Sequence, residues 1–267
     1  MRAGVLGSPI AHSLSPLLHR AAYDALGLDW TYDALEVTEQ ELPGFLDSRG
    51  PEWAGLSLTM PLKEAVLPLL TDRTPLVDAT GAANTVVLSG GNRIGHNTDV
   101  GGLLAALQER GVTQARAPVI LGGGATARSA LAALAAMGCD QAVLVVRSPP
   151  TATLAAAARL GIVALVAPFV PEAEPSVLAG CDLLISTVPT RAADPFAPYV
   201  SDLPVLVDVV YDPWPTALAA ACGGLVIPGT AMLLHQAAAQ VALITGLAPP
   251  VGAMRAALKG PPRLAER

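Results

Sequence analysis

The stretch PVILGGGATARSALAALAAMGCDQAVLVVR, residues 118–147, decides the fold of this chain. An apolar run at 118–121 stops at three glycines, an alanine-rich run follows at 126–137, and a valine-rich run at 142–146 stops at Arg147. The order of strand, glycine turn, helix and strand is typical of one βαβ unit. We therefore expect a parallel sheet with helices packed on its faces.

The glycine turn has the composition of a phosphate-binding loop. Glycine lets the backbone turn tightly and approach a phosphate, and the N-terminus of the following helix presents free N–H groups to an anion. A tight turn without a ligand is the alternative interpretation. If the turn binds a phosphate, the residues that face the cofactor are Gly122, Gly123, Gly124, Ala125, Thr126 and Ala127.

The end of the second strand bears on the choice of dinucleotide. An NAD site usually carries an acidic residue there, which binds the ribose 2′-hydroxyl. This chain has Arg147 and Ser148, a cation and a hydroxyl, which suit a 2′-phosphate. The pattern favours NADP as the cofactor. The alternative is that Arg147 is only a solvated charge at the strand end.

Composition and charge argue against several classes of protein. The chain has 267 residues, of which 52% are hydrophobic and 14% charged, so it can form a substantial core. The net charge of −6 and the lack of a basic block argue against nucleic-acid binding. Three widely spaced cysteines predict neither a disulfide framework nor a metal site. No signal peptide or membrane span is recognisable, so we expect a cytoplasmic protein without a membrane partner.

Apolar runs along the chain predict two α/β domains. Residues 1–100 carry short strand patterns separated by helical ones, and we assign them to a first domain. Residues 101–230 alternate strand and helix regularly, which predicts a doubly wound, Rossmann-type domain whose strands are buried on both faces. Two helical runs follow, and we expect residues 231–267 to return to the first domain because the last parallel strand is already complete.

Candidate chemical groups stand at predicted helix starts. Ser15 followed by Pro16 predicts a helix with Ser15 as its N-cap. Lys63 falls in the first turn of the helix opened by Pro61, where the helix dipole disfavours a cation, and such a conflict with a local rule is typical of functional residues. Asp99 also begins a helix, where the plainest interpretation is an N-cap carboxylate.

Four other polar residues are candidates by position. Tyr211 follows the fifth strand of the predicted parallel sheet, at the carboxyl end where ligands bind in such sheets. Gln236 lies in an apolar helical run, where a buried amide needs hydrogen-bond partners. Thr59 and Asn84 are turn residues with no further signal of their own. The four histidines show no metal-ligand spacing, so no metal site is predicted.

Taken in chain order, these and other motifs resemble those of the shikimate dehydrogenase family. The resemblance covers nearly the whole chain. The motifs are GSPIAHSLSP at 7–16, TMPLK at 59–63, GAANT at 81–85, NTD at 97–99, the glycine loop, Arg147-Ser148, STVP at 186–189, DVVYDP at 208–213, PG at 228–229 and MLLHQ at 232–236.

The resemblance implies an NADP-dependent oxidoreductase that reversibly reduces 3-dehydroshikimate to shikimate, with Lys63 and Asp99 as the catalytic pair. We expect a small-molecule substrate and a monomer or homodimer. The implied substrate-binding residues are Ser13, Ser15, Thr59, Lys63, Asn84, Asp99, Tyr211 and Gln236. The implied cofactor-binding residues are 122–127 with Arg147, Ser148, Val209 and Gly229.

Two departures from the family pattern leave alternatives open. Family members often have Asn where this chain has Ser57, and many carry a second basic residue soon after the position of Arg147, which is lacking here. The first alternative is therefore a quinate/shikimate dehydrogenase that uses NAD. The second is a non-catalytic, nucleotide-binding relative, against which the presence of both Lys63 and Asp99 argues. A folate-type dehydrogenase does not account for Ser13 and Ser15.

Overall fold

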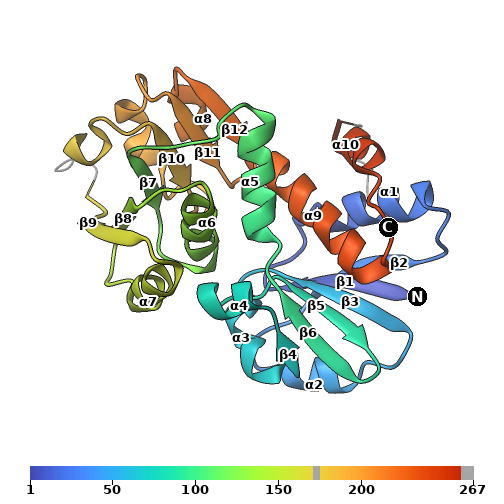
Figure 1. Ribbon diagram of the computed structural model, residues 1–267. Helices are drawn as coiled ribbons and strands as arrows, with labels where there is room; N and C mark the ends of the chain where they lie inside the picture. Colours follow the sequence, from blue (N-terminus) through green and yellow to red (C-terminus); the bar gives the residue numbers. More distant parts are fainter. Residues whose placement is uncertain (171–174, 260–267) are drawn as a thin grey trace.

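The computed structural model describes residues 1–170 and 175–259 of the chain. It has two α/β lobes, each built on a six-stranded sheet (Figure 1). Helices α5 (Asp99–Glu109) and α9 (Gly229–Thr245) pack side by side and run between the lobes. The predicted α/β class with a Rossmann-type portion is confirmed.

The first lobe has a mixed sheet in the order β2-β1-β3-β5-β6-β4. Its centre is parallel, because β1 pairs with both β2 and β3 in that sense, and the hairpin β5–β6 then adds antiparallel pairing. Glycines at 90 and 91 form the hairpin turn. The strands are β1 (Arg2–Gly7), β2 (Thr31–Glu36), β3 (Trp53–Leu58), β4 (Asp72–Arg73), β5 (Thr85–Ser89) and β6 (Asn92–His96).

Short helices connect these strands. They are α1 (Ser15–Ala25), α2 (Leu42–Asp47), α3 (Leu62–Ala65), the 3₁₀ turn η1 (Leu67–Leu69) and α4 (Pro75–Thr80). The prediction that Ser15 caps α1 is wrong: Ser15 is the first helical residue and Leu14 is the N-cap. The hydroxyl of Ser13 instead accepts a hydrogen bond from the Ser15 N–H at 3.3 Å, so the cap-like acceptor comes from two residues earlier in the chain.

The second lobe has a fully parallel sheet in the order β12-β11-β10-β7-β8-β9. Numbered within the lobe, this is 6-5-4-1-2-3, the doubly wound order in which ligands bind where the strand order reverses. The strands are β7 (Pro118–Leu121), β8 (Gln141–Val146), β9 (Val163–Pro168), β10 (Leu183–Ser186), β11 (Val205–Asp208) and β12 (Leu225–Pro228). The helical elements are α6 (Ala125–Ala136), α7 (Thr151–Leu160), η2 (Pro175–Leu178), η3 (Asp194–Tyr199) and α8 (Ala217–Ala221).

Central strands of the second sheet are buried on both faces, as their continuous apolar runs predict; every residue of β7 and β10 is buried. Strand β9 is the exception. It lies at the sheet edge, and its Val163 and Leu165 are 58% and 50% exposed. The reason is topological, because an edge strand has a neighbour on one side only.

After β12 the chain returns to the first lobe. Helix α9 packs against β3, β5 and α1, and α10 (Val251–Lys259) packs against α1 (Figure 1). Side chains such as Leu234 and Ala237 of α9 share one core cluster with Val5 and Leu18.

The domain limits at residues 100 and 230 stay predictions. No described helix combines the length and apolarity that a membrane span requires.

Candidate active site

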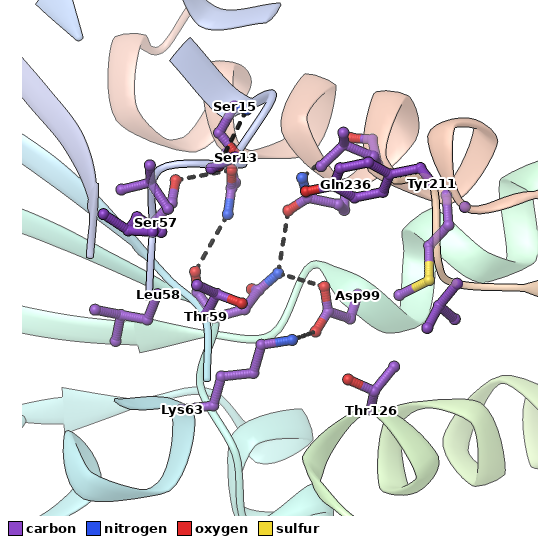
Figure 2. Close-up of a pocket in the computed structure, with 18 of the residues that line it drawn as sticks. Ser13, Ser15, Ser57, Leu58, Thr59, Lys63, Asp99, Thr126, Tyr211 and Gln236 are labelled. Carbon is purple, nitrogen blue, oxygen red and sulfur yellow. Dashed lines mark hydrogen bonds and ion pairs between the residues drawn. The ribbon is translucent and has the colours of Figure 1, made fainter. Parts of the chain in front are cut away.

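A pocket lies between the two lobes, beside residues that follow β11 and β12 at the carboxyl edge of the second sheet. Figure 2 shows the side chains that line it. Its lining includes every residue that the sequence predicts for substrate binding. These are Ser13, Ser15, Thr59, Lys63, Asn84, Asp99, Tyr211 and Gln236. They come from loops and helices far apart in the chain, so the fold alone brings them together.

Lys63 and Asp99 form an ion pair in this pocket. Lys63 Nζ donates to Asp99 Oδ2 at 2.6 Å, and their side chains are 14% and 6% exposed (Figure 2). Lys63 lies in the short helix α3, whereas Asp99 is the first residue of α5, where the positive end of the helix dipole stabilises its carboxylate. Little solvent competes for this pair, so its geometry is well defined.

Asn84 holds the other carboxylate oxygen of Asp99. Its Nδ2 donates to Asp99 Oδ1 at 2.8 Å and lies 3.3 Å from Gln236 Oε1. Its Oδ1 accepts from the Thr98 N–H at 2.7 Å. Asn84 is only 2% exposed. A residue that looks like an ordinary turn amide in the sequence therefore orients Asp99.

Tyr211 closes the pocket from the second lobe. Burial raises the pKa of its phenol, and the backbone of Leu14 hydrogen-bonds its hydroxyl. The loop after β11 thus meets the start of α1, beside Ser13 and Ser15. Among the described residues that line the pocket, Lys63 is the only lysine or arginine, so an anionic group bound near α1 would be held by hydroxyls.

Three of the predicted cofactor-facing residues, Thr126, Val209 and Gly229, also line the pocket. Glycine is required at 229, because a Cβ there would collide with the carbonyl of Val209. It is required at 122 as well, since Gly122 has φ +110° and a Cβ would collide with the side chain of Thr187. At both positions glycine is required by the packing of the chain on itself, whereas Gly124 has open space where a Cβ would stand.

The other predicted cofactor residues lie outside this pocket. Gly123 in the loop and Ala125, the first residue of α6, are partly exposed, and Gly124 between them is the exposed N-cap of α6. Arg147 and Ser148 follow β8 and are exposed at the carboxyl edge of the sheet. The side chain of Ala127 is fully buried in the core, so only its backbone can face the loop.

Sequence reasoning missed Ser57 and Gln240 as pocket residues. The Tyr32 hydroxyl donates to Ser57 Oγ at 2.6 Å, Ser57 Oγ donates to Gln240 Oε1 at 2.8 Å, and Gln240 Nε2 donates to Thr85 Oγ1 at 3.0 Å. Gln240 stands four residues after Gln236, on the same face of α9, and that spacing was available in the sequence. The remaining lining residues without an earlier assignment are Val5, Ile10, His12, Leu58, Met232 and Leu233.

Metal-binding geometry is not found within the described ranges, where no cluster of three or more histidine, cysteine, aspartate or glutamate side chains could hold an ion. The site therefore consists of one buried ion pair, a set of hydroxyls and amides, and a glycine-shaped loop on the facing lobe.

Two family models match parts of this chain. The shikimate dehydrogenase substrate binding domain matches residues 5–86, and the shikimate 5′-dehydrogenase C-terminal domain matches residues 229–259. A curated relative from Citrifermentans bemidjiense, a shikimate dehydrogenase (NADP(+)), is 37% identical over 273 residues, which cover 96% of this chain and 93% of the relative.

Solved structures agree with that match. The shikimate dehydrogenase of Mycobacterium tuberculosis superposes with a TM-score of 0.89 at 43% identity, over 97% of this chain and 98% of the other. The shikimate 5-dehydrogenase of Thermus thermophilus, in complex with NADP(H) and shikimate, gives a TM-score of 0.84 at 32% identity, with the same coverage of 97% and 98%. The chain belongs to the shikimate dehydrogenase family.

Proposed function

We propose that this protein catalyses the reversible, NADP-dependent reduction of 3-dehydroshikimate to shikimate, a step of aromatic amino acid biosynthesis. The observation that carries the proposal is the Lys63–Asp99 pair, 2.6 Å apart, in a pocket completed by Thr126 and Val209 of the second lobe. A proton donor on one lobe thus faces the lobe that carries the glycine loop. Family membership supports the choice of substrate.

The lining fits a small polyhydroxylated acid. Ser13 and Ser15 at the start of α1, with Tyr211 opposite, can hold a carboxylate through their hydroxyls. Thr59, Asn84 and Gln236 offer hydrogen bonds to ring hydroxyls. Several neutral contacts hold the substrate in this arrangement, which leaves the ion pair available for the reacting oxygen.

The residues present also fit a dinucleotide. Gly124, the N-cap of α6, has open space where a Cβ would stand, and the N-terminus of α6 directs N–H groups to the same side. Residues 122–127 would hold the pyrophosphate, and Val209 and Gly229 would border the nicotinamide. When bound, the cofactor supplies or accepts the hydride.

Lys63 is the proton donor in this proposal. As negative charge develops on the C3 oxygen of dehydroshikimate, the Lys63 ammonium gives that oxygen a proton, and in the reverse direction the neutral amine accepts it. Asp99 hydrogen-bonds the same hydroxyl and holds Lys63 in place. Asn84 fixes Asp99 through its second oxygen, so the pair keeps one orientation during turnover.

Arg147 and Ser148 favour NADP over NAD. Both are exposed at the end of β8, the position from which a side chain reaches the ribose of a bound dinucleotide. A guanidinium and a hydroxyl there match the 2′-phosphate, whereas an acidic residue would match a 2′-hydroxyl.

We further infer that the protein works in the cytoplasm as a monomer or homodimer, on a small-molecule substrate. All three cysteines, Cys139, Cys181 and Cys222, are free thiols, as expected in a reducing compartment. The residues proposed to bind the substrate come from one chain, which fits either oligomeric state.

Initial rates with four substrate pairs test the proposal: shikimate or quinate, each with NADP or NAD. The expected result is the highest kcat/KM for shikimate with NADP. A preference for quinate or for NAD would favour the alternative dehydrogenase instead. Binding of NADPH without oxidation of either acid would contradict the proposed enzyme and support a nucleotide-binding relative.

A further inference from the structure

Arg128 is a buried cation in the contact between the two lobes. It lies in α6, is 2% exposed, and donates through Nε to the carbonyl of Thr80 at 2.6 Å and through Nη2 to that of Gly81 at 3.2 Å. These carbonyls end α4, where the negative end of the helix dipole favours a cation. Helices α4 and α6 lie next to each other at this junction (Figure 1).

The same guanidinium forms an ion pair with Glu64. Arg128 Nη2 lies 2.8 Å from Glu64 Oε1, and Glu64 directly follows Lys63 in α3. Because α3 has only four residues, its own hydrogen bonds define its position weakly. One further hydrogen bond joins α3 to the segment before β5: the Ala83 N–H donates to the Lys63 carbonyl at 2.8 Å.

The other end of this connection reaches the cofactor side of the pocket. Helix α6 begins at Ala125, and Thr126 in its first turn lines the pocket near Asp99 (Figure 2). Arg128 stands two residues later, on the helix that follows the glycine loop. A single side chain therefore links the helix of the proposed proton donor to the helix that follows the phosphate-binding loop.

We propose that Arg128, through Glu64, is a positioning residue that sets the place of the Lys63 ammonium relative to the cofactor. The inference rests on the proposed function, because it assumes that Lys63 donates the proton. Hydride and proton must reach neighbouring atoms of one carbonyl, so a small displacement of α3 against α6 misaligns them. Glu64 is half-exposed, whereas Arg128 is buried and keeps two backbone carbonyls as partners when Glu64 is removed. Removing Glu64 therefore leaves Arg128 hydrogen-bonded but releases α3 from α6.

The chain offers a matched control residue for Arg128 and another for Glu64. Arg159 of α7 crosses the same junction and donates to the Ala79 carbonyl of α4 at 3.0 Å, yet within the described part of the chain it makes no hydrogen bond or ion pair with α3. Asp78 of α4 pairs with Arg73 at 2.6 Å, and its side chain is 53% exposed against 54% for Glu64. Neither control contacts Lys63 through α3.

The deciding experiment compares kcat, KM and Tm of Glu64→Ala and Arg128→Lys with those of Arg159→Ala and Asp78→Ala. We expect Glu64→Ala to lower kcat roughly 10-fold, because the reacting groups are misplaced rather than removed. KM for shikimate and NADP should stay within about twofold, since ground-state contacts remain. Arg128→Lys keeps the charge without the fork of donors, and it should lower kcat in the same way.

The outcomes separate positioning from simple support of the fold. If Glu64→Ala keeps wild-type kcat, or if Asp78→Ala and Arg159→Ala lower kcat equally, the inference is overturned. Should Arg128→Lys fail to fold, Glu64→Ala decides alone, because its half-exposed side chain is not needed for the core. A wild-type protein unable to oxidise shikimate refutes the proposed function itself, and this inference with it.

Discussion

Lys63 Nζ lies 2.6 Å from Asp99 Oδ2, although the two residues are 36 positions apart and belong to different helices. The chain between Lys63 and Asp99 forms β5 and β6 and carries the buried amide of Asn84, which hydrogen-bonds Asp99. The folding of this segment brings the two residues together. Both side chains are largely withdrawn from water, so each charge depends on the other. This mutual dependence makes the pair the point at which the proposed chemistry is tested most directly.

Replacement of Lys63 by alanine should lower kcat for shikimate oxidation by about 10²–10⁴-fold, the usual contribution of a positioned general acid or base. KM for shikimate should change little, because hydroxyls and amides make most of the proposed substrate contacts. Steady-state kinetics with shikimate and NADP measures both constants. Turnover near the wild-type value would remove Lys63 from the mechanism.

Lys63→Arg is the matched variant for this test. It keeps a positive charge beside Asp99 but cannot release a proton at neutral pH, since the guanidinium remains protonated. If Lys63 acts through proton transfer, Lys63→Arg should be nearly as impaired as Lys63→Ala. If charge alone matters, Lys63→Arg should retain most of the activity.

The sequence carries enough information to predict the parallel sheet and, with the family resemblance, part of the pocket lining. The glycine loop and the valine-rich strand that stops at Arg147 are local patterns, and local patterns are what periodicity reports. Lys63 and Asp99 could be named because each stands at a helix start in a recognisable motif. Local patterns do not predict that they touch, since the contact depends on how β5 and β6 fold back; the pairing follows only from the family resemblance.

Other features were beyond local reasoning. Ser57 and Gln240 form a hydrogen bond across 183 positions, and no local pattern indicates that the two meet. The apolar run of β9 has the composition of a buried strand, but its exposure follows from its place at the sheet edge. Ser15 was expected to be the cap of α1 from the Ser-Pro pair alone, whereas Ser13 provides the acceptor.

Arg147→Ala should reduce the preference for NADP over NAD. The guanidinium is exposed at the end of β8, so its removal should leave stability unchanged while a charge-assisted bond to the 2′-phosphate is lost. The ratio of kcat/KM values for NADP and NAD is expected to fall by about 10- to 100-fold, with kcat/KM for NAD preserved.

The control for this prediction is Arg116→Ala. It removes the same charge from the second lobe, but from an exposed position before β7, at the amino edge of the sheet. Arg116→Ala should keep the wild-type cofactor preference. A similar loss of preference in both variants would mean that net charge, rather than the place of Arg147, governs the choice.

Acidification should destabilise the protein through His19, which is fully buried and stacked on Tyr32 with ring centroids 3.9 Å apart. Burial lowers the pKa of His19 to about 4, although a hydrogen bond to Gln240 opposes the shift. Between pH 6.5 and 4 the unfolded chain binds a proton that the folded chain does not, so stability is complete above pH 6.5 and declines as the pH falls toward 4. The loss of unfolding free energy should reach about 3 kcal/mol, from the size of the pKa shift and 1.36 kcal/mol per pKa unit.

Urea unfolding at a series of pH values measures this loss. His19→Phe should flatten the dependence of stability on pH between 6.5 and 4, because an aromatic ring remains but no longer titrates. His12→Phe, at an exposed histidine, is the control, and an equally steep curve in His19→Phe would assign the acid sensitivity to other groups.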